Sequence, residues 1–387
     1  MKVDHCESAK KIWAVVVSVT ALLSLLWGCS VFAQTKREQK ILEHGILDYS
    51  DAKLGDVLAR MRPTESKFII SAEKVGEVTA SRGSRFLIPE NAFVFPNGKR
   101  VTGNVEFKVK EVIDDFDFVT SGVDLSTVDE NGQRVYLQSA GMFHVSAQSR
   151  GQELELAPGK KIDVQFPDIV PGDEFFVYKM NKSGQWEKHG HNQELMTQTN
   201  PVDGESSSIG VRVYAIDGMT WWNFDSPFPH VACLKGEVED PDQVFVPPYK
   251  VTTIGMSYKG SFDRYIERKD FRINAHRSKY VKVLIVDTKG NVGISGNIKV
   301  TDKRGHDKYK EGEMVPEVDL ANRQPTGKKY KNYCQDIGKI PIRKLSENIM
   351  KDKGAFQRYL GLNKEYYRVD YQENSSETDP DSSASTP

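Results

Sequence analysis

Three aspartates in a short run are the first candidates for chemistry. Asp114, Asp115 and Asp117 lie together, and Asp124 follows a few residues later. Carboxylate oxygens are the ligands that Ca²⁺ prefers, and extracellular sandwiches often collect them in loops. The run lacks the spacing of an EF-hand calcium loop, and acidic loops are usually just solvated. The sequence therefore offers Ca²⁺ as the one cofactor to test, with a solvated acidic loop as the alternative.

Histidines suggest a second kind of metal site. His189 and His191 would point to the same side of a strand, and His230 shortly precedes Cys233. A zinc or transition-metal site needs further ligands at close spacing, and neither motif has them nearby. We therefore expect solvated loop histidines at 189 and 191, and a structural role for His230.

An aromatic run offers a possible binding platform. Trp221 and Trp222 are followed by Asn223 and Asp225 in the densest aromatic region of the chain. Exposed, these rings would suit a carbohydrate or a peptide; buried, they would serve core and interdomain packing. We favour packing, with Asn223 and Asp225 fixing a linker through side-chain-to-backbone hydrogen bonds.

Motifs with a known catalytic mechanism are missing from the sequence. It has no Gly-x-Ser-x-Gly nucleophile elbow, no His-Glu-x-x-His zinc motif and no phosphate-binding loop. Ser71 and Lys74 match Ser-x-x-Lys, but the companion motifs of that catalytic arrangement are absent. We therefore predict that the protein is not an enzyme.

Residues 1–33 have the layout of a secretory signal peptide. Lys10 and Lys11 precede an apolar run that is too short for a comfortable membrane span, and a small-x-small cleavage site ends at Ala33. Cys29 offers an alternative, because the residues before it resemble a bacterial lipobox whose cysteine is lipidated. We expect an exported protein in the periplasm, at the outer membrane or at the cell surface. Membrane contact is expected only if Cys29 is lipidated.

Charge and cysteine content set further bounds. The 387 residues include 53 Lys and Arg against 54 Asp and Glu, a formal net charge of −1. Such a balance gives no broad field for nucleic acid or an anionic membrane, although it leaves room for a local patch. Cleavage of the leader leaves Cys233 and Cys334, which either form one disulfide or stay buried and reduced.

The elements that must position these residues are mostly strands. Leu54, Leu58 and Met61 recur at helical spacing, after which alternation of period two takes over, as in the stretch 105–110. We predict a mainly β fold of two tandem antiparallel β-sandwiches, with a short N-terminal helix and a partly helical, partly disordered C-terminal extension. The expected segments are a signal peptide 1–33, a helical segment 34–63, a first sandwich 64–220, an aromatic linker 221–232, a second sandwich 233–302, a C-terminal extension 303–371 with a helix near 342–360, and a disordered tail 372–387.

Short motifs occur in an order typical of one group of proteins. The run from Ile88 through Pro89 to Phe93 is followed by an Asn-Gly turn and later by Ala157-Pro158-Gly159. This series resembles secreted or lipid-anchored envelope proteins of Bacteroidota and a ZU5-like β-sandwich. The segments 221–225 and 233–238 are similar to the linker and first strand of the carboxypeptidase-regulatory, transthyretin-like domain that follows in that group, here in a degenerate form. The resemblance implies a non-catalytic surface module.

These observations favour a non-catalytic, exported cell-envelope protein. We expect a structural or adhesive element or a protein-interaction scaffold, in which the first sandwich binds and the second is a spacer. The partner would be an envelope or surface protein or a glycan, and no nucleic acid is expected. Two alternatives stay open: a carbohydrate-binding module built on Trp221 and Trp222, and a hydrolase whose site is assembled from distant loops.

Overall fold

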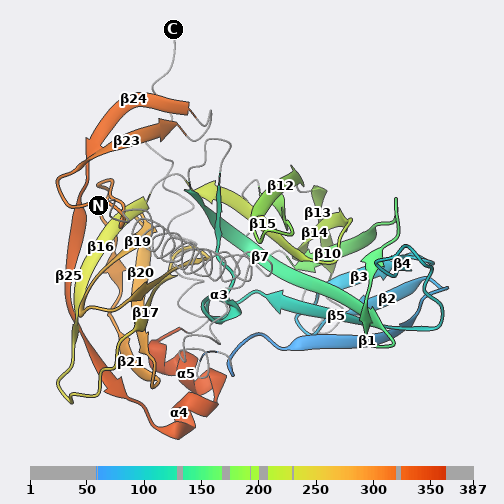
Figure 1. Ribbon diagram of the computed structural model, residues 1–387, viewed down its shortest axis with the longest axis horizontal. Helices are drawn as coiled ribbons and strands as arrows, with labels where there is room; N and C mark the ends of the chain where they lie inside the picture. The colour runs from blue at the N-terminus through green and yellow to red at the C-terminus, as the bar shows by residue number, and fades with distance from the viewer. Residues whose placement is uncertain are drawn as a thin grey trace, which may run out of the picture.

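The computed structural model shows a mainly β chain folded into two units that lie side by side (Figure 1). It describes residues 58, 60–128, 134–167, 175–191, 193–199, 208–228, 231–319 and 324–362. The predicted leader with Cys29, most of the predicted N-terminal helix, His230 and the predicted disordered tail lie outside the described residues. Among the described helices, none has the length and apolar character needed to cross a membrane.

The first unit is a sandwich of two antiparallel sheets whose inner faces share one core. In spatial order, the larger sheet contains β1 (Glu65–Ser71), β5 (Asn104–Val112), β7 (Arg134–Ser149), β15 (Trp221–Phe228), β11 (Phe176–Met180) and β12 (Trp186–His191), with β6 (Ser126–Val128) and β8 (Gln152–Glu153) on β7. The smaller sheet contains β13 (Gln193–Thr199), β14 (Ser208–Ile216), β10 (Ile162–Pro167), β3 (Arg85–Ile88) and β2 (Gly76–Thr79). A short pair, β4 (Phe93–Val94) and β9 (Glu155–Leu156), completes the unit.

Alternation along the strands explains why these two layers form. In β5, Val105, Phe107 and Val109 are buried, while the residues between them are partly exposed. In β10, Ile162 and Val164 are fully buried and the residue between them faces solvent. Successive side chains of a strand point to opposite faces, so each strand has one apolar side for the shared core. The prediction of a mainly β fold with sandwich-type sheets is confirmed.

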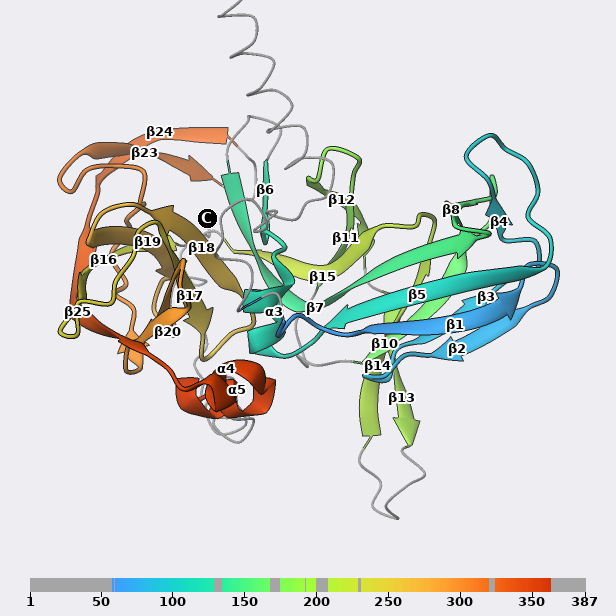
Figure 2. The same ribbon diagram turned by 60° about the horizontal axis from the view of Figure 1, so that its bottom comes forward.

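The second unit is a sheet that folds over its own core. Its strands in spatial order are β18 (Ser261–Ile266), β17 (Tyr249–Gly255), β20 (Tyr280–Asp287), β21 (Asn291–Ile294), β25 (Cys334–Lys344), β16 (Val231–Glu239) and β19 (Asp270–His276), with β22 (Ile298–Lys299) on β20. All neighbouring pairs are antiparallel except β16 with β25, which is parallel. A separate hairpin of β23 (Met314–Asp319) and β24 (Gln324–Lys331) stands at one end of the unit (Figure 2).

The second unit does not end at residue 302, where the sequence suggested a boundary. β25 lies inside its sheet, and the expected helix near 342–360 is divided into α4 (Glu347–Lys351) and α5 (Lys353–Leu360). Ile340 and Ile342 are both buried at a spacing of two, which fits a strand. Pro341 lies between them and has no N–H to donate inside a helix, which disfavours the expected helix at this point. The strand runs to Lys344.

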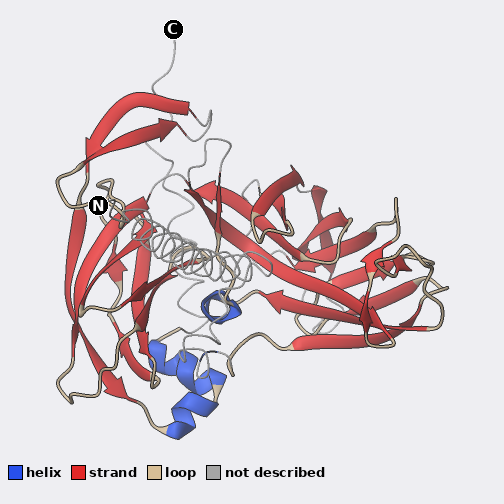
Figure 3. Ribbon diagram, viewed as in Figure 1, coloured by secondary structure: helices blue, strands red, loops and turns tan. Residues whose placement is uncertain are grey.

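A buried junction joins the two units. The helix α3 (Asp115–Ser121), between β5 and β6, inserts Phe116 and Val119 among apolar residues of the second unit. Figure 3 shows α3 on the side of the first unit that faces the second, with α4 and α5 below it. The rings of Phe116 and Phe356 lie 5.4 Å apart, so α5 closes the same cluster from the C-terminal side. The Ser139 amide donates a backbone hydrogen bond of 3.1 Å to the Lys259 carbonyl, which links the two units directly.

We predict that Phe356→Ala weakens this junction. Phe356 is fully buried, and removing a buried phenyl ring costs about 3 kcal/mol or more. Tyr359→Ala on the same helix is the matched control, because its side chain is 37% exposed. Urea unfolding followed by fluorescence should show a lower midpoint, and a separate early transition, for Phe356→Ala alone. Equal effects of both substitutions would contradict a junction closed by α5.

Candidate functional site

The acidic run lies at the start of α3 and is neutralised from within the chain. Asp114 forms an ion pair of 2.8 Å with Arg82, and Asp115 lies 3.5 Å from Lys259 of the second unit. Asp117 is fully buried, accepts hydrogen bonds from the Ile113 and Asp114 amides, and is paired with Lys353 of α5.

Side-chain cations therefore occupy the positions next to these carboxylates. Among the described residues, no group of three or more His, Cys, Asp or Glu side chains is arranged to hold a metal ion. The calcium interpretation of Asp114, Asp115 and Asp117 gains no support, because each carboxylate already faces a lysine or an arginine. The run instead connects the first unit, the second unit and α5.

The two tryptophans are part of the interior. Trp221 is 3% exposed and packs in a cluster with Trp186, while Trp222 is fully buried in the core of the first unit. The Trp222 ring nitrogen donates a hydrogen bond of 3.0 Å to the Gly218 carbonyl. Neither ring has a free face for a sugar or a peptide, so the platform hypothesis for Trp221 and Trp222 is wrong and packing accounts for both.

Asn223 and Asp225 also point inward, at a bulge between β7 and β15. The register shifts between them, and Gly141 opposite has a φ of 116°, which only glycine adopts readily. The Ser139 hydroxyl donates to the Asn223 carbonyl oxygen at 2.7 Å and accepts from the Gly141 amide, and the Asn223 amide donates to Asp225. Burial raises the pKa of Asp225 well above its ordinary value, which favours its protonated form. These side chains fix the bulge rather than the linker that we expected.

The histidines do not converge in the described part of the chain. The side chain of His189 is exposed. Its Nε2 lies 3.2 Å from an Asp217 oxygen, and one edge of its ring packs against Trp222. The side chain of His191 and the whole of His230 lie outside the described residues.

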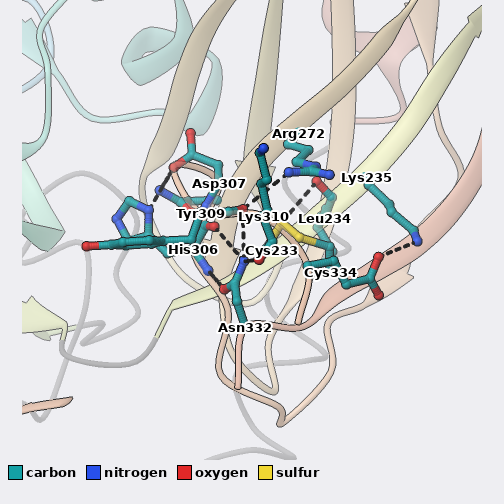
Figure 4. Close-up of a disulfide and its surroundings, with 12 residues drawn as sticks. Cys233, Leu234, Lys235, Arg272, His306, Asp307, Tyr309, Lys310, Asn332 and Cys334 are labelled. Atoms are coloured by element: carbon teal, nitrogen blue, oxygen red, sulfur yellow. Dashed lines mark hydrogen bonds and ion pairs between the residues drawn. A yellow bond between two sulfur atoms is a disulfide. The ribbon is translucent and has the colours of Figure 1, made fainter. Parts of the chain in front are cut away.

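The best-organised surface is built around a disulfide in the second unit (Figure 4). Cys233 in β16 lies directly opposite Cys334 in β25, and the structure joins them. Of the two alternatives left open by the sequence, the structure has the bridged one. Both cysteines are buried, and the loop 303–313 passes over them. A Cβ atom at Gly305 would lie 1.9 Å from the Tyr333 carbonyl oxygen and 2.9 Å from the Cys233 nitrogen, so only glycine fits there.

A single buried asparagine holds this loop in place. The Asn332 side-chain oxygen accepts from the His306 amide at 2.7 Å, and its side-chain nitrogen donates to the carbonyls of His306, Tyr309 and Lys310. The Asn332 backbone adds two bonds, accepting from Gly312 and donating to Glu313. Because Asn332 is next but one to Cys334, the disulfide and the loop form one rigid assembly.

A charged cluster fixes the other side of the loop. Asp307 is paired with Arg264 at 2.9 Å, accepts from the Asn274 amide at 2.9 Å and lies 3.0 Å from His306 Nδ1. Burial alone would raise the pKa of Asp307, but the hydrogen bond to His306 and the charge of Arg264 hold it below its ordinary value. Asn274 also donates to the hydroxyl of Tyr136 at 2.8 Å, so the first unit contributes to this cluster.

The His306–Asp307 pair has the form of a base with its orienting carboxylate. His306 Nδ1 lies 3.0 Å from an Asp307 oxygen and accepts from the Lys308 amide at 3.1 Å. These contacts, with the ion pair between Asp307 and Arg264, fix this part of the loop.

Sequence reasoning missed this loop, although signals for it existed. The segment 303–331 is charged and has no sustained period, so the sequence predicts only that it belongs to a C-terminal extension. Gly305, Asn332 and Cys334 fix the loop, but their contacts join positions far apart in the sequence.

No protein-family model matches the chain. A search of curated proteins likewise finds no match.

We predict that Asp225→Asn stabilises the protein in a pH-dependent manner. The folded state keeps the Asp225 proton where the unfolded chain releases it, so this carboxyl destabilises the fold increasingly as pH rises from about 4. The amide cannot ionise, so the variant should gain almost no stability at pH 4 and increasingly more as the pH rises toward 8. Thermal unfolding across this range measures the difference. Asp163→Asn, at an exposed position of β10, is the control and should show no such trend.

Gly305→Ala should release the loop from the disulfide. The added methyl cannot fit against Tyr333 and Cys233, so the loop must move away. Trypsin should then cut after Lys303, Arg304, Lys308 or Lys310 at least about tenfold faster, because proteolysis follows local opening. Gly296→Ala is the matched control, since nothing lies within 4 Å of its Cβ position. Equal cleavage of both variants, mapped by mass spectrometry, would count against the proposed packing.

Proposed function

We propose that this chain is an exported, non-catalytic interaction scaffold of a bacterial cell envelope. The observation that carries the proposal is the loop 303–313, which a buried disulfide and Asn332 hold rigid at the surface. Disulfides persist in oxidising compartments, which agrees with the signal-peptide layout of residues 1–33. A rigid surface loop loses little conformational entropy on binding, so it suits recognition.

In this proposal the second unit makes the contact, and not the first. The sequence suggested the opposite arrangement, with the second unit as a spacer. The polar candidates of the first unit, Asp117, Asn223 and Asp225, are all buried and engaged in internal contacts. The loop 303–313, in contrast, exposes Lys308 and Lys310 while its backbone is fixed from beneath.

We further propose that the first unit is ZU5-like and the second carboxypeptidase-regulatory-like. Support for the first comes from the Ile-Pro turn: β3 ends at Ile88, Pro89 follows, and Ala92 and Phe93 return to the core. Support for the second is its single sheet of seven main strands folded over one core.

Binding to envelope material tests the scaffold role. Mature protein should sediment with an envelope extract of the producing bacterium and turn over no substrate in a hydrolase panel. Asn332→Ala removes the side-chain bonds that fix the loop and should reduce the sedimented fraction about tenfold, since each such bond contributes about 1 kcal/mol. Asn97→Ala, in an exposed turn of the first unit, is the control. Turnover of a substrate without envelope binding would overturn the proposal.

A further inference from the structure

The near-neutral net charge of the chain hides a strong separation. Residues 34–232 contain 22 Lys and Arg against 29 Asp and Glu, whereas residues 264–344 contain 20 against 10. The first unit is therefore acidic, and most of the second unit is basic. A charge separation on this scale produces an electrostatic field that differs from one end of the molecule to the other.

Several acids of the basic stretch are engaged in contacts within the chain. Glu311 is paired with Lys235 at 2.8 Å, Glu317 with Arg304, and Asp307 with Arg264. Glu313 accepts from the Lys310 amide, and Asp336 accepts from the Gly338 amide. The three ion-paired carboxylates are compensated by cations of the fold, and the stretch as a whole keeps its excess of positive charge.

Several exposed lysines of the loop and the hairpin have no ion-pair partner among the described residues. This unpaired set, which we call the lysine face, comprises Lys303, Lys308, Lys310, Lys328, Lys329 and Lys331.

The loop and the hairpin form one continuous surface. Gly312 donates to the Asn332 carbonyl at 2.8 Å, and the Asn332 amide donates to Glu313 at 2.7 Å, so the end of the loop runs beside the end of β24. Lys329 and Lys331 lie on the same face of β24, separated by roughly 7 Å along the strand. This arrangement gives a row of positive charges rather than a single point.

Aromatic rings hold the cations at the edge of this surface. The Lys303 ammonium lies 4.6 Å from the centre of the Tyr333 ring, and the Arg304 guanidinium lies 6.0 Å from the Tyr330 ring. Such contacts restrict long side chains that would otherwise lose entropy on binding. Since each of these rings already carries a cation, recognition here would rely on charge and not on stacking of sugars.

We propose that the lysine face binds an acidic polysaccharide of the envelope. This inference rests on the proposed scaffold function and specifies its partner. A linear polyanion matches a row of unpaired ammonium groups along the loop and β24. An anionic membrane fits less well, because membrane binding also uses buried apolar side chains, and Met314 is the one large exposed apolar residue of this region among the described residues.

The experiment uses polygalacturonate as the probe and neutral dextran as its uncharged counterpart. Mature wild-type protein should bind immobilised polygalacturonate at about 0.15 M salt and be released at about 1 M, where charges are screened within a few ångströms. The triple variant K310Q/K329Q/K331Q should bind at least about tenfold more weakly. The control K67Q/K99Q/K161Q removes the same charge from exposed positions of the first unit and should bind like the wild type.

Several outcomes would overturn the assignment. Equal binding by the triple variant and the control would exclude the lysine face, and tighter lysine-dependent binding to phosphatidylglycerol vesicles would point to a membrane. Undiminished envelope sedimentation by the triple variant would reject the polysaccharide while leaving the scaffold role intact. Absence of envelope sedimentation by the wild type would instead reject the scaffold role itself. Circular dichroism of both triple variants excludes misfolding as the cause.

Discussion

The parallel pairing of β16 with β25 is the constraint on which the rest of the structure depends. The two strands are separated by 101 residues at the bridged cysteines, and their pairing joins β16 and β19 to the rest of the sheet of the second unit. Long-range parallel pairing is slow to form and costs loop-closure entropy. In the chain-entropy model, a disulfide across a loop of this length offsets about 4–5 kcal/mol of that cost. The proposed export to an oxidising compartment agrees with this disulfide as well as with the predicted leader.

Two features on opposite sides of the unit follow from this pairing. Before β25, the chain must run from β22 back to Cys334, and the loop 303–313 and the β23–β24 hairpin make that return over the disulfide. After β25, the chain reaches α4 and α5, which close the junction beneath α3. One strand thus positions both the surface that we propose for binding and the contact that holds the two units together.

The sequence was most informative where a residue's environment depends on its near neighbours. Alternation in β5 and β10 predicted their buried faces, because the period of a strand is a local property. The burial of Trp221 and Trp222 could not be predicted in this way, since the side chains that cover them come from distant segments. Asp117 and Lys353 illustrate the same limit, because their ion pair joins positions that no local pattern connects.

The proposed binding surface was missed for a related reason, because a whole-chain charge sum averages over the two units. The proposed recognition requires that the units keep a fixed orientation, since independent tumbling would let the acidic unit approach the proposed anionic partner. Phe116 and Phe356, with the Ser139–Lys259 backbone bond, provide that fixed orientation. A rigid, charge-separated molecule experiences a torque near a polyanion that turns its basic end inward and its acidic end outward. The buried junction is therefore as necessary to the proposed recognition as the lysines that make the contact.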